Sequence, residues 1–92
     1  MKKPTAPDPI AKALDARRKT HGDFAEQAHI AQEIKGLLRR TPNWDRLSYA
    51  QREALEHDAT KTARILCGNP REPDHWLDKA GYAHLVYTEL TK

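Results

Sequence analysis

The sequence predicts an all-α fold, a small four-helix bundle-like domain, and three observations carry this prediction. Apolar residues recur at three- and four-residue spacings along most of the chain, as they do on one face of a helix. No stretch alternates apolar and polar residues with the β-branched enrichment of a strand. Helix start and stop signals divide the chain into four segments. A chain of 92 residues has room for one modest core.

The N-terminal part of the chain divides into a tail and the first helix. Residues 1–7 are rich in proline and lysine, and we expect them to be a disordered tail ahead of a single domain at 8–92. Asp8 followed by Pro9 is typical of an N-cap with proline at the first helical position, which predicts a helix over about 9–19. The run from Thr20 to Gly22 is expected to end it.

The second predicted helix begins at Asp23, which has the capping-box spacing to Glu26, and runs to about Arg40. Its apolar stripe consists of Phe24, Ala28, Ala31, Ile34 and Leu38. A stop at Thr41-Pro42-Asn43 follows, and we expect Trp44 to anchor the connecting loop to the core.

The third predicted helix opens at a capping box of Ser48 and Gln51 and ends at Gly68. On it, Asp58 and Lys61 interrupt an otherwise apolar line, which must therefore border solvent or a polar cleft. Its inner side carries Leu55, Ala59, Thr62, Ile65 and Leu66. The last helix starts at Pro73 or Asp74, and its apolar stripe, with Trp76 expected as a core anchor, is Trp76, Ala80, Ala83, Tyr87 and Leu90.

Charge and composition restrict the function classes. The net charge is +3, but 16 basic residues less Lys2 and Lys3 leave 14 against 13 acidic residues after residue 7, so the domain is near +1. That balance disfavours nucleic acid as a partner. Cys67 is the only cysteine, which fits a reducing cytosol, and the residue pattern leads us to expect neither a secretory signal nor a membrane span. We therefore expect a soluble cytoplasmic protein whose thin core favours homo-oligomerisation.

One charged constellation stands out in the second half of the sequence. Lys61 and Arg64 lie one turn apart on the third helix, and Asp74 and Asp78 lie one turn apart on the fourth. Two neighbouring carboxylates repel each other unless a cation offsets them. The cation is either a metal ion or the Lys61/Arg64 pair on the preceding helix.

Each of these residues also has a structural interpretation. Asp74 can cap the last helix, and Asp78 can form a salt bridge to Lys61 or Arg64 that clamps two helices together. Glu26 can be a capping-box residue with no role in binding a metal ion. His21, beside Gly22, is either a ligand to phosphate or part of a turn. Spacing leaves these alternatives open.

Three segments, residues 18–28 (RKTHGDFAEQA), 61–70 (KTARILCGNP) and 74–83 (DHWLDKAGYA), carry a family resemblance. Together they resemble small phage and prophage proteins of unknown function, which are themselves similar to the all-α MazG-like nucleotide pyrophosphohydrolases. The resemblance spans about residues 17–88, and its most distinctive part is the D-x-x-x-D-x-A-G-Y pattern that begins at Asp74.

The resemblance implies a phage-encoded, magnesium-dependent enzyme of the host cytoplasm that binds a nucleoside triphosphate and releases the monophosphate and pyrophosphate. It implies Asp74, Asp78 and Glu26 as ligands of magnesium, or of manganese in its place. Magnesium suits such a site because it prefers oxygen ligands and shares its shell with phosphates. Lys61, Arg64 and His21 would contact the phosphates and stabilise developing charge.

This sequence departs from the family in the number of its acidic residues. MazG-like enzymes carry a dense E-E-x-x-E cluster on the second helix, whereas this chain has only Glu26 and Glu33 there. The departure supports a second hypothesis from another class. In it the fold is retained as an interaction module that modulates a host or phage protein, and the acidic pair is a helix clamp.

Overall fold

A computed structural model describes residues 8–92, and the tail predicted at 1–7 lies outside these residues. The described part is all-α, as predicted, with no strand. Its four helices and one 3-10 turn (η1) are α1 (Pro9–His21), α2 (Phe24–Arg39), η1 (Trp44–Arg46), α3 (Tyr49–Cys67) and α4 (Pro73–Leu90). The predicted boundaries agree within two residues, and the one difference of note is that Thr20 and His21 belong to α1.

The helix starts follow from the capping residues in the sequence. Asp8 accepts a hydrogen bond from the Ile10 N–H at 3.0 Å, and Asp23 accepts one from the Glu26 N–H at 3.1 Å. Ser48 forms the complete capping box with Gln51. These bonds satisfy amides that have no partner inside the helix.

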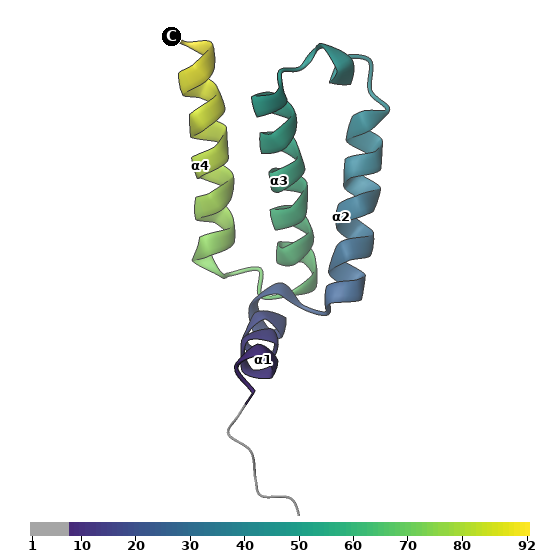
Figure 1. Ribbon diagram of the computed structural model, residues 1–92, viewed down its shortest axis with the longest axis vertical. Helices are drawn as coiled ribbons and strands as arrows, with labels where there is room; N and C mark the ends of the chain where they lie inside the picture. The colour runs from purple at the N-terminus through teal and green to yellow at the C-terminus, as the bar shows by residue number, and fades with distance from the viewer. Residues whose placement is uncertain (1–7) are drawn as a thin grey trace, which may run out of the picture.

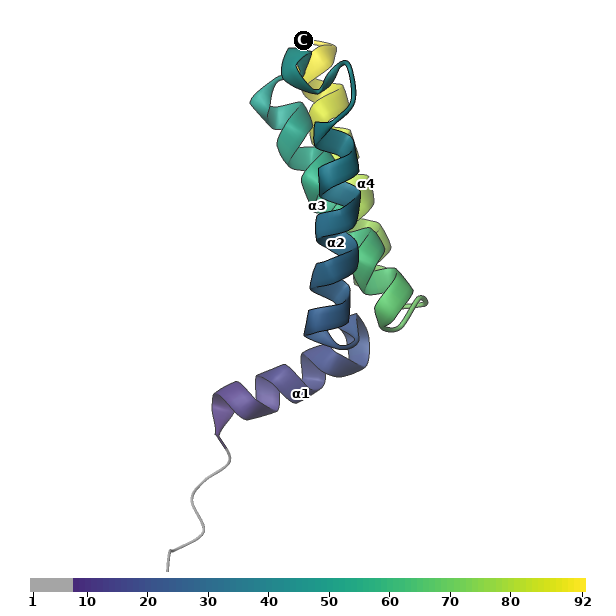
Figure 2. The same cartoon turned by 90° about the vertical axis from the view of Figure 1, so that its right-hand side faces the viewer.

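Helices α2, α3 and α4 lie side by side in one layer with α3 in the middle (Figure 1). The view turned by 90° shows this layer edge-on, with α1 leaving it at its lower end (Figure 2). Only the C-terminal end of α1 reaches the layer, and no residue of α1 is buried. The arrangement is therefore bundle-like, with one layer of three helices and an inclined fourth.

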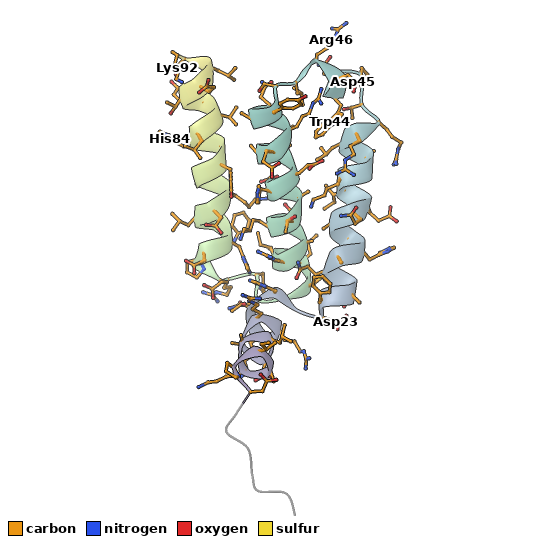
Figure 3. The ribbon with its side chains drawn as sticks, viewed as in Figure 1. Asp23, Trp44, Asp45, Arg46, His84 and Lys92 are labelled. Carbon is orange, nitrogen blue, oxygen red and sulfur yellow. The ribbon has the colours of Figure 1, made fainter. Side chains whose placement is uncertain are left out.

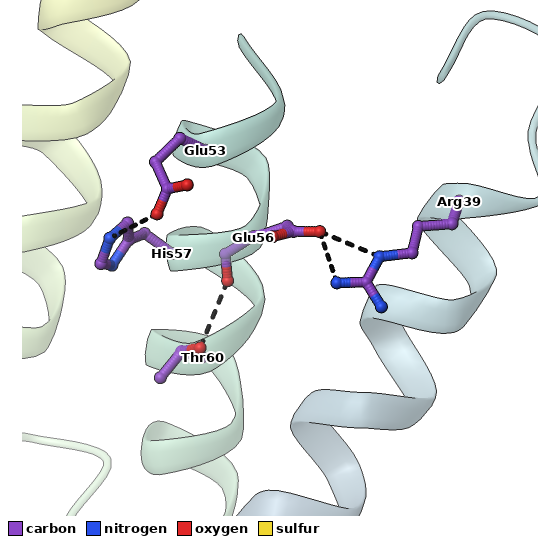
Figure 4. Close-up of polar contacts among 5 residues, drawn as sticks. All are labelled: Arg39, Glu53, Glu56, His57 and Thr60. Atoms are coloured by element: carbon purple, nitrogen blue, oxygen red, sulfur yellow. Dashed lines mark hydrogen bonds and ion pairs between the residues drawn. The ribbon is translucent and has the colours of Figure 1, made fainter. Parts of the chain in front are cut away.

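Polar contacts bind α2 to α3 across the layer. The Nε and Nη2 atoms of Arg39 both donate to Oε1 of Glu56, at 3.0 and 2.7 Å (Figure 4). On the other side of α3, His57 lies 3.1 Å from Glu53 and stacks on the ring of Tyr82 at a centroid distance of 4.3 Å. Side chains of α3 therefore contact both neighbouring helices.

The buried core of the described chain is small. Its apolar members are Ala31, Trp44, Ala59 and Ala63, which confirms Trp44 as an anchor. The expectation for Trp76 is wrong, because this side chain is 53% exposed. Phe24, Leu66, Tyr87 and Leu90, predicted on inner stripes, are also exposed. The physical reason is the single layer, which leaves each helix with a face that no other helix covers.

Candidate functional site

Candidate functional residues gather where the C-terminal end of α1 meets α3 and α4. The carbonyl oxygen of Thr20 accepts hydrogen bonds from the Asn69 N–H at 3.0 Å and from Nε2 of His75 at 3.1 Å. His75 is 2% exposed, and its ring lies 5.2 Å from that of His21. This contact fixes the last turn of α1 against the layer.

Two glycines allow the chain segments to cross closely at this point. Gly22 has a φ of 82°, in the region that favours glycine, and a Cβ there would collide with the carbonyl oxygen of Cys67. A Cβ at Gly68 would collide in turn with the carbonyl oxygen of Thr20. The turn between α1 and α2 is therefore pressed against the end of α3, and this brings His21 next to α3.

A cavity of about 650 Å³ opens in the angle between α1, α2 and α3. Its walls carry three arginines, Arg17, Arg18 and Arg64, together with His21. The one acidic residue of the wall, Asp23, uses its Oδ2 to cap α2. Figure 3 labels Asp23 at this end of the layer. The excess of cationic groups makes the cavity suited to an anion.

Arg64 has an unsatisfied group in this wall. Its Nε is buried and has no hydrogen-bond partner. A buried guanidinium N–H without a partner costs free energy. Arginine also matches the oxygens of a phosphate group with its fork of donors.

The electrostatics at His21 report the same positive field. Burial, as the largest cause, together with interactions with Arg64, His75, Lys61 and Arg17 lowers the pKa of His21 from 6.5 to about 4. The imidazole is therefore neutral at neutral pH. An anion bound beside it would offset these positive charges and favour the imidazolium.

Charged residues in the second half of the sequence form ion pairs between α3 and α4. Nζ of Lys61 lies 2.7 Å from Oδ2 of Asp78, and Nζ of Lys79 lies 2.8 Å from Oδ1 of Asp58. Lys79 also donates to the hydroxyl of Thr62 at 2.6 Å. The line of α3 that carries Asp58 and Lys61 thus borders a polar seam between two helices.

The structure brings together some of the predicted site residues and separates others. Arg64 and His21 line the cavity, and Lys61 lies close enough to act on the pKa of His21. Asp78 is paired with Lys61, whereas Asp74 is exposed in the first turn of α4 and Glu26 is exposed in the first turn of α2. Within residues 8–92 no three His, Cys, Asp or Glu side chains form a group that could hold a metal ion.

Several residues of the cavity were not assigned to it from the sequence. Arg17 and Arg18 lie near the C-terminal end of α1, where the helix dipole by itself favours cations, and the sequence predicts Phe24 in the apolar stripe of α2. Phe24 is instead 77% exposed at the cavity, and Gln27, which also lines it, is buried. Helical spacing was a usable signal, because Leu14, Arg17 and His21 share one face of α1.

Comparisons with known proteins were negative: no protein-family model, no curated protein and no solved structure matches this chain. Across the part of the chain that the structure describes, none of the helices has the length and apolar character needed to cross a membrane.

Proposed function

We propose that this protein binds a nucleotide, whose phosphates occupy the cavity between α1, α2 and α3. The observation that carries the proposal is the meeting of three arginines, Arg17, Arg18 and Arg64, in the wall of one cavity. Phosphate oxygens would accept hydrogen bonds from all three guanidinium groups. His21 would add a donor when it is protonated.

A nucleotide is favoured over a bare phosphate by the size and lining of the cavity. Its volume of about 650 Å³ exceeds what one phosphate needs and lies in the range of small-molecule sites. Phe24 presents a largely exposed ring there, and Leu14 of α1 also lines the cavity. A base between these apolar groups would be held by stacking and burial, while the buried amide of Gln27 offers hydrogen bonds to its edge.

In this proposal magnesium binds as a complex with the nucleotide. Because Asp74, Asp78 and Glu26 do not meet, the ion would be held mainly by phosphate oxygens and water. Its contribution would be to neutralise phosphate charge. The MazG-like resemblance further implies that the protein hydrolyses the bound triphosphate to the monophosphate and pyrophosphate in the host cytoplasm. We include this activity in the proposal, and the experiment below tests it.

A second candidate function is supported by a separate observation. Twelve large apolar side chains of the described chain are exposed, including Leu77 and Leu85 on α4. Exposed apolar surface on this scale is typical of an interaction site. If the protein is a helical interaction module, this apolar surface binds a partner protein and the cavity binds no nucleotide.

The test is titration calorimetry of the full chain with orthophosphate, pyrophosphate and a panel of ribo- and deoxyribonucleoside triphosphates, each with and without magnesium. We expect a triphosphate to bind more tightly than orthophosphate. Arg64→Gln should weaken that binding by about tenfold or more, the effect of one lost charged hydrogen bond. The same samples are assayed for pyrophosphate release.

Two further variants control this experiment. Arg17→Ala with Arg18→Ala changes exposed residues of the wall and should also weaken binding without unfolding the layer. Arg46→Ala removes an arginine at the opposite end of the layer and should bind as the parent chain does (Figure 3). Equal affinity of Arg64→Gln and Arg46→Ala, or no binding of any nucleotide, would exclude the proposal and favour the interaction module.

A further inference from the structure

The last helix carries its apolar stripe on a surface that the described chain leaves open. On α4, Trp76, Tyr87 and Leu90 are 53%, 66% and 65% exposed, and Ala80 and Ala83 are exposed as well. These five residues are spaced by four, three, four and three positions, which is the heptad pattern of helices that pack along one another. The inner face of α4 is a different one, where Lys79 and Asp78 reach α3.

The stripe is complementary to itself in the antiparallel direction. Ala83 stands at its midpoint, seven residues from Trp76 and seven from Leu90. When the helix is paired with an antiparallel copy about Ala83, Trp76 falls opposite Leu90, and Ala80, three residues before the axis, falls within one residue of the level of Tyr87, four residues after it. The two alanines at the axis let the helices approach closely, and on either side of it a small side chain lies near a large one, as close packing requires.

We propose that the stripe of α4 binds the same stripe of a second copy of this chain, antiparallel across a two-fold axis at Ala83. An isologous contact of this kind needs one patch that fits itself, which is what the spacing provides. Pairing adds a second layer to a fold that has only one. Domains are stable when two layers enclose a core between them, so the dimer supplies the core that one chain lacks.

The surface beside the stripe continues the proposed contact. A groove of about 380 Å³ runs between α3 and α4, and Leu47, Leu55, Ala83 and Val86 are among its walls. Ala83 belongs to both the stripe and the groove. Three helices about 27 Å long and about 10 Å apart present a face of roughly 800 Å², which is what each partner contributes to a standard interface.

The side chain of Trp76 is fixed in position on the surface of α4. Its Nε1 donates to the carbonyl oxygen of Pro70 at 3.1 Å, and the ammonium of Lys79 lies 6.0 Å from the centre of its ring. An aromatic side chain fixed in one position loses little entropy when it is buried by a partner. Tryptophan and tyrosine are also the residues that most often dominate binding at interfaces.

The dimer contact and the nucleotide cavity lie on opposite faces of the layer. Leu55 of the groove and Arg64 of the cavity are nine residues apart on α3, which is two and a half helical turns. Pairing through α4 therefore leaves the cavity open. The dimer does not rest on the nucleotide proposal, and either can fail without the other.

The first test measures the mass of the full chain in solution by light scattering coupled to gel filtration. One chain has a mass of 10.5 kDa, so the dimer has twice that mass, 21 kDa. Tyr87→Lys should reduce the mass to that of one chain with helix content retained, because a buried lysine has no partner at that level. Thr88→Lys, an equally exposed neighbour outside the stripe, should leave the mass at 21 kDa.

A second test does not depend on the folding of a monomeric variant. In a Cys67→Ala background, Ala83→Cys should form a disulfide between two chains on mild oxidation, because the axis brings the two copies of this position together. Tyr87→Cys should not, since antiparallel packing separates its two copies, and Thr88→Cys should not. A parent chain with the mass of one copy, or equal cross-linking at positions 83 and 88, would overturn the proposal. Efficient cross-linking of Tyr87→Cys would overturn the antiparallel orientation.

Discussion

Lys61 on α3 and Asp78 on α4 form an ion pair of 2.7 Å, and the Lys side chain is only 14% exposed. One turn of α3 earlier, the order of charges is reversed, since Asp58 on α3 pairs with Lys79 on α4 at 2.8 Å. An ammonium that is mostly removed from water is costly unless a carboxylate faces it. The two pairs therefore fix the register of α3 against α4. They also occupy Asp78, the carboxylate that the family resemblance implies as a metal ligand.

The first prediction concerns the pH dependence of the Lys61–Asp78 pair. The hydrogen bond from Lys61 lowers the pKa of Asp78 below its ordinary value. A lowered pKa in the folded state means that the carboxylate stabilises the fold above the ordinary pKa of aspartate, and that this stabilisation is lost as pH falls through the lowered value. Asp78→Asn should therefore be less stable than the parent chain at neutral pH, with a difference that shrinks in acid.

Urea unfolding at pH 7 and near pH 3 (on the order of one unit below the free aspartate pKa) measures this difference. Asp45→Asn, in η1 at the opposite end of the layer, is the matched control and should show little change at either pH. If Asp78→Asn were as stable as the parent chain at pH 7, Lys61 would be stabilised by something other than this carboxylate.

The second prediction separates two glycines that look alike in the sequence. Gly22→Ala should lower the free energy of unfolding by about 3 kcal/mol or more, because the residue has a positive φ and its Cβ would meet the carbonyl oxygen of Cys67. Gly81→Ala should raise it by about 0.5 to 1 kcal/mol, since nothing lies within 4 Å of a Cβ there and alanine is the better helix former. Thermal unfolding followed by circular dichroism distinguishes the two. Destabilisation by Gly81→Ala would indicate a close neighbour at that position, such as a partner chain.

The third prediction concerns the contact of Arg39 with Glu56, which joins α2 to α3. Two N–H groups of Arg39 donate to one oxygen of Glu56, whose side chain is 24% exposed. Arg39→Ala should cost about 1 kcal/mol, and Arg39→Lys should restore only part of it, because an ammonium cannot reproduce the two parallel donors. Arg40→Ala changes the next residue and should cost less than half as much. Chemical unfolding in low and high salt measures the free energy of unfolding of the three variants. If Arg39→Lys were as stable as the parent chain, the charge alone would account for the contribution of Arg39.

Local signals in the sequence were sufficient for the helices. Asp8, Asp23 and Ser48 each cap the helix that they were predicted to cap. Caps and glycine stops act within a few residues, so they can be recognised without knowledge of the tertiary structure. The same holds for the apolar periodicity of each helix, which gives the stripe but does not show what covers it.

Whether each apolar stripe is buried could not be predicted, because its burial depends on how many layers the helices form. Trp76 has the right spacing for a core residue and is nevertheless half exposed. The candidate site was foreseen only in part for a related reason. Arg64 and His21 were singled out, but their meeting with Arg17 depends on the angle at which α1 leaves the layer, and the close crossing at Gly22 sets that angle.

The last prediction joins the pKa of His21 to the binding of an anion. Because its pKa in the folded state is lowered to about 4, the unfolded chain takes up the proton first as pH falls below 6.5. Stability contributed by the neutral His21 is therefore present above pH 6.5 and is lost progressively as pH approaches 4. His21→Gln should abolish this loss.

A bound oxyanion reverses this effect at the same residue. In addition to burial, which is the largest cause, the pKa of His21 is lowered by the positive charges of Arg64 and Lys61 on α3 and Arg17 on α1, and by the neighbouring His75 on α4. An anion beside Arg64 offsets them, so His21 takes up a proton when the anion binds. Affinity should then rise as pH falls from 7 to about 5. Sulfate is the suitable probe, because its own charge does not change over this range.

Thermal unfolding at several sulfate concentrations gives the affinity at each pH. The parent chain should bind sulfate more tightly at pH 5 than at pH 7, whereas His21→Gln should bind with the same affinity at both. Arg46→Ala is expected to follow the parent chain, since Arg46 lies at the far end of the layer. A pH-independent affinity of the parent chain would place the anion away from His21, and with it the phosphates of the proposed nucleotide.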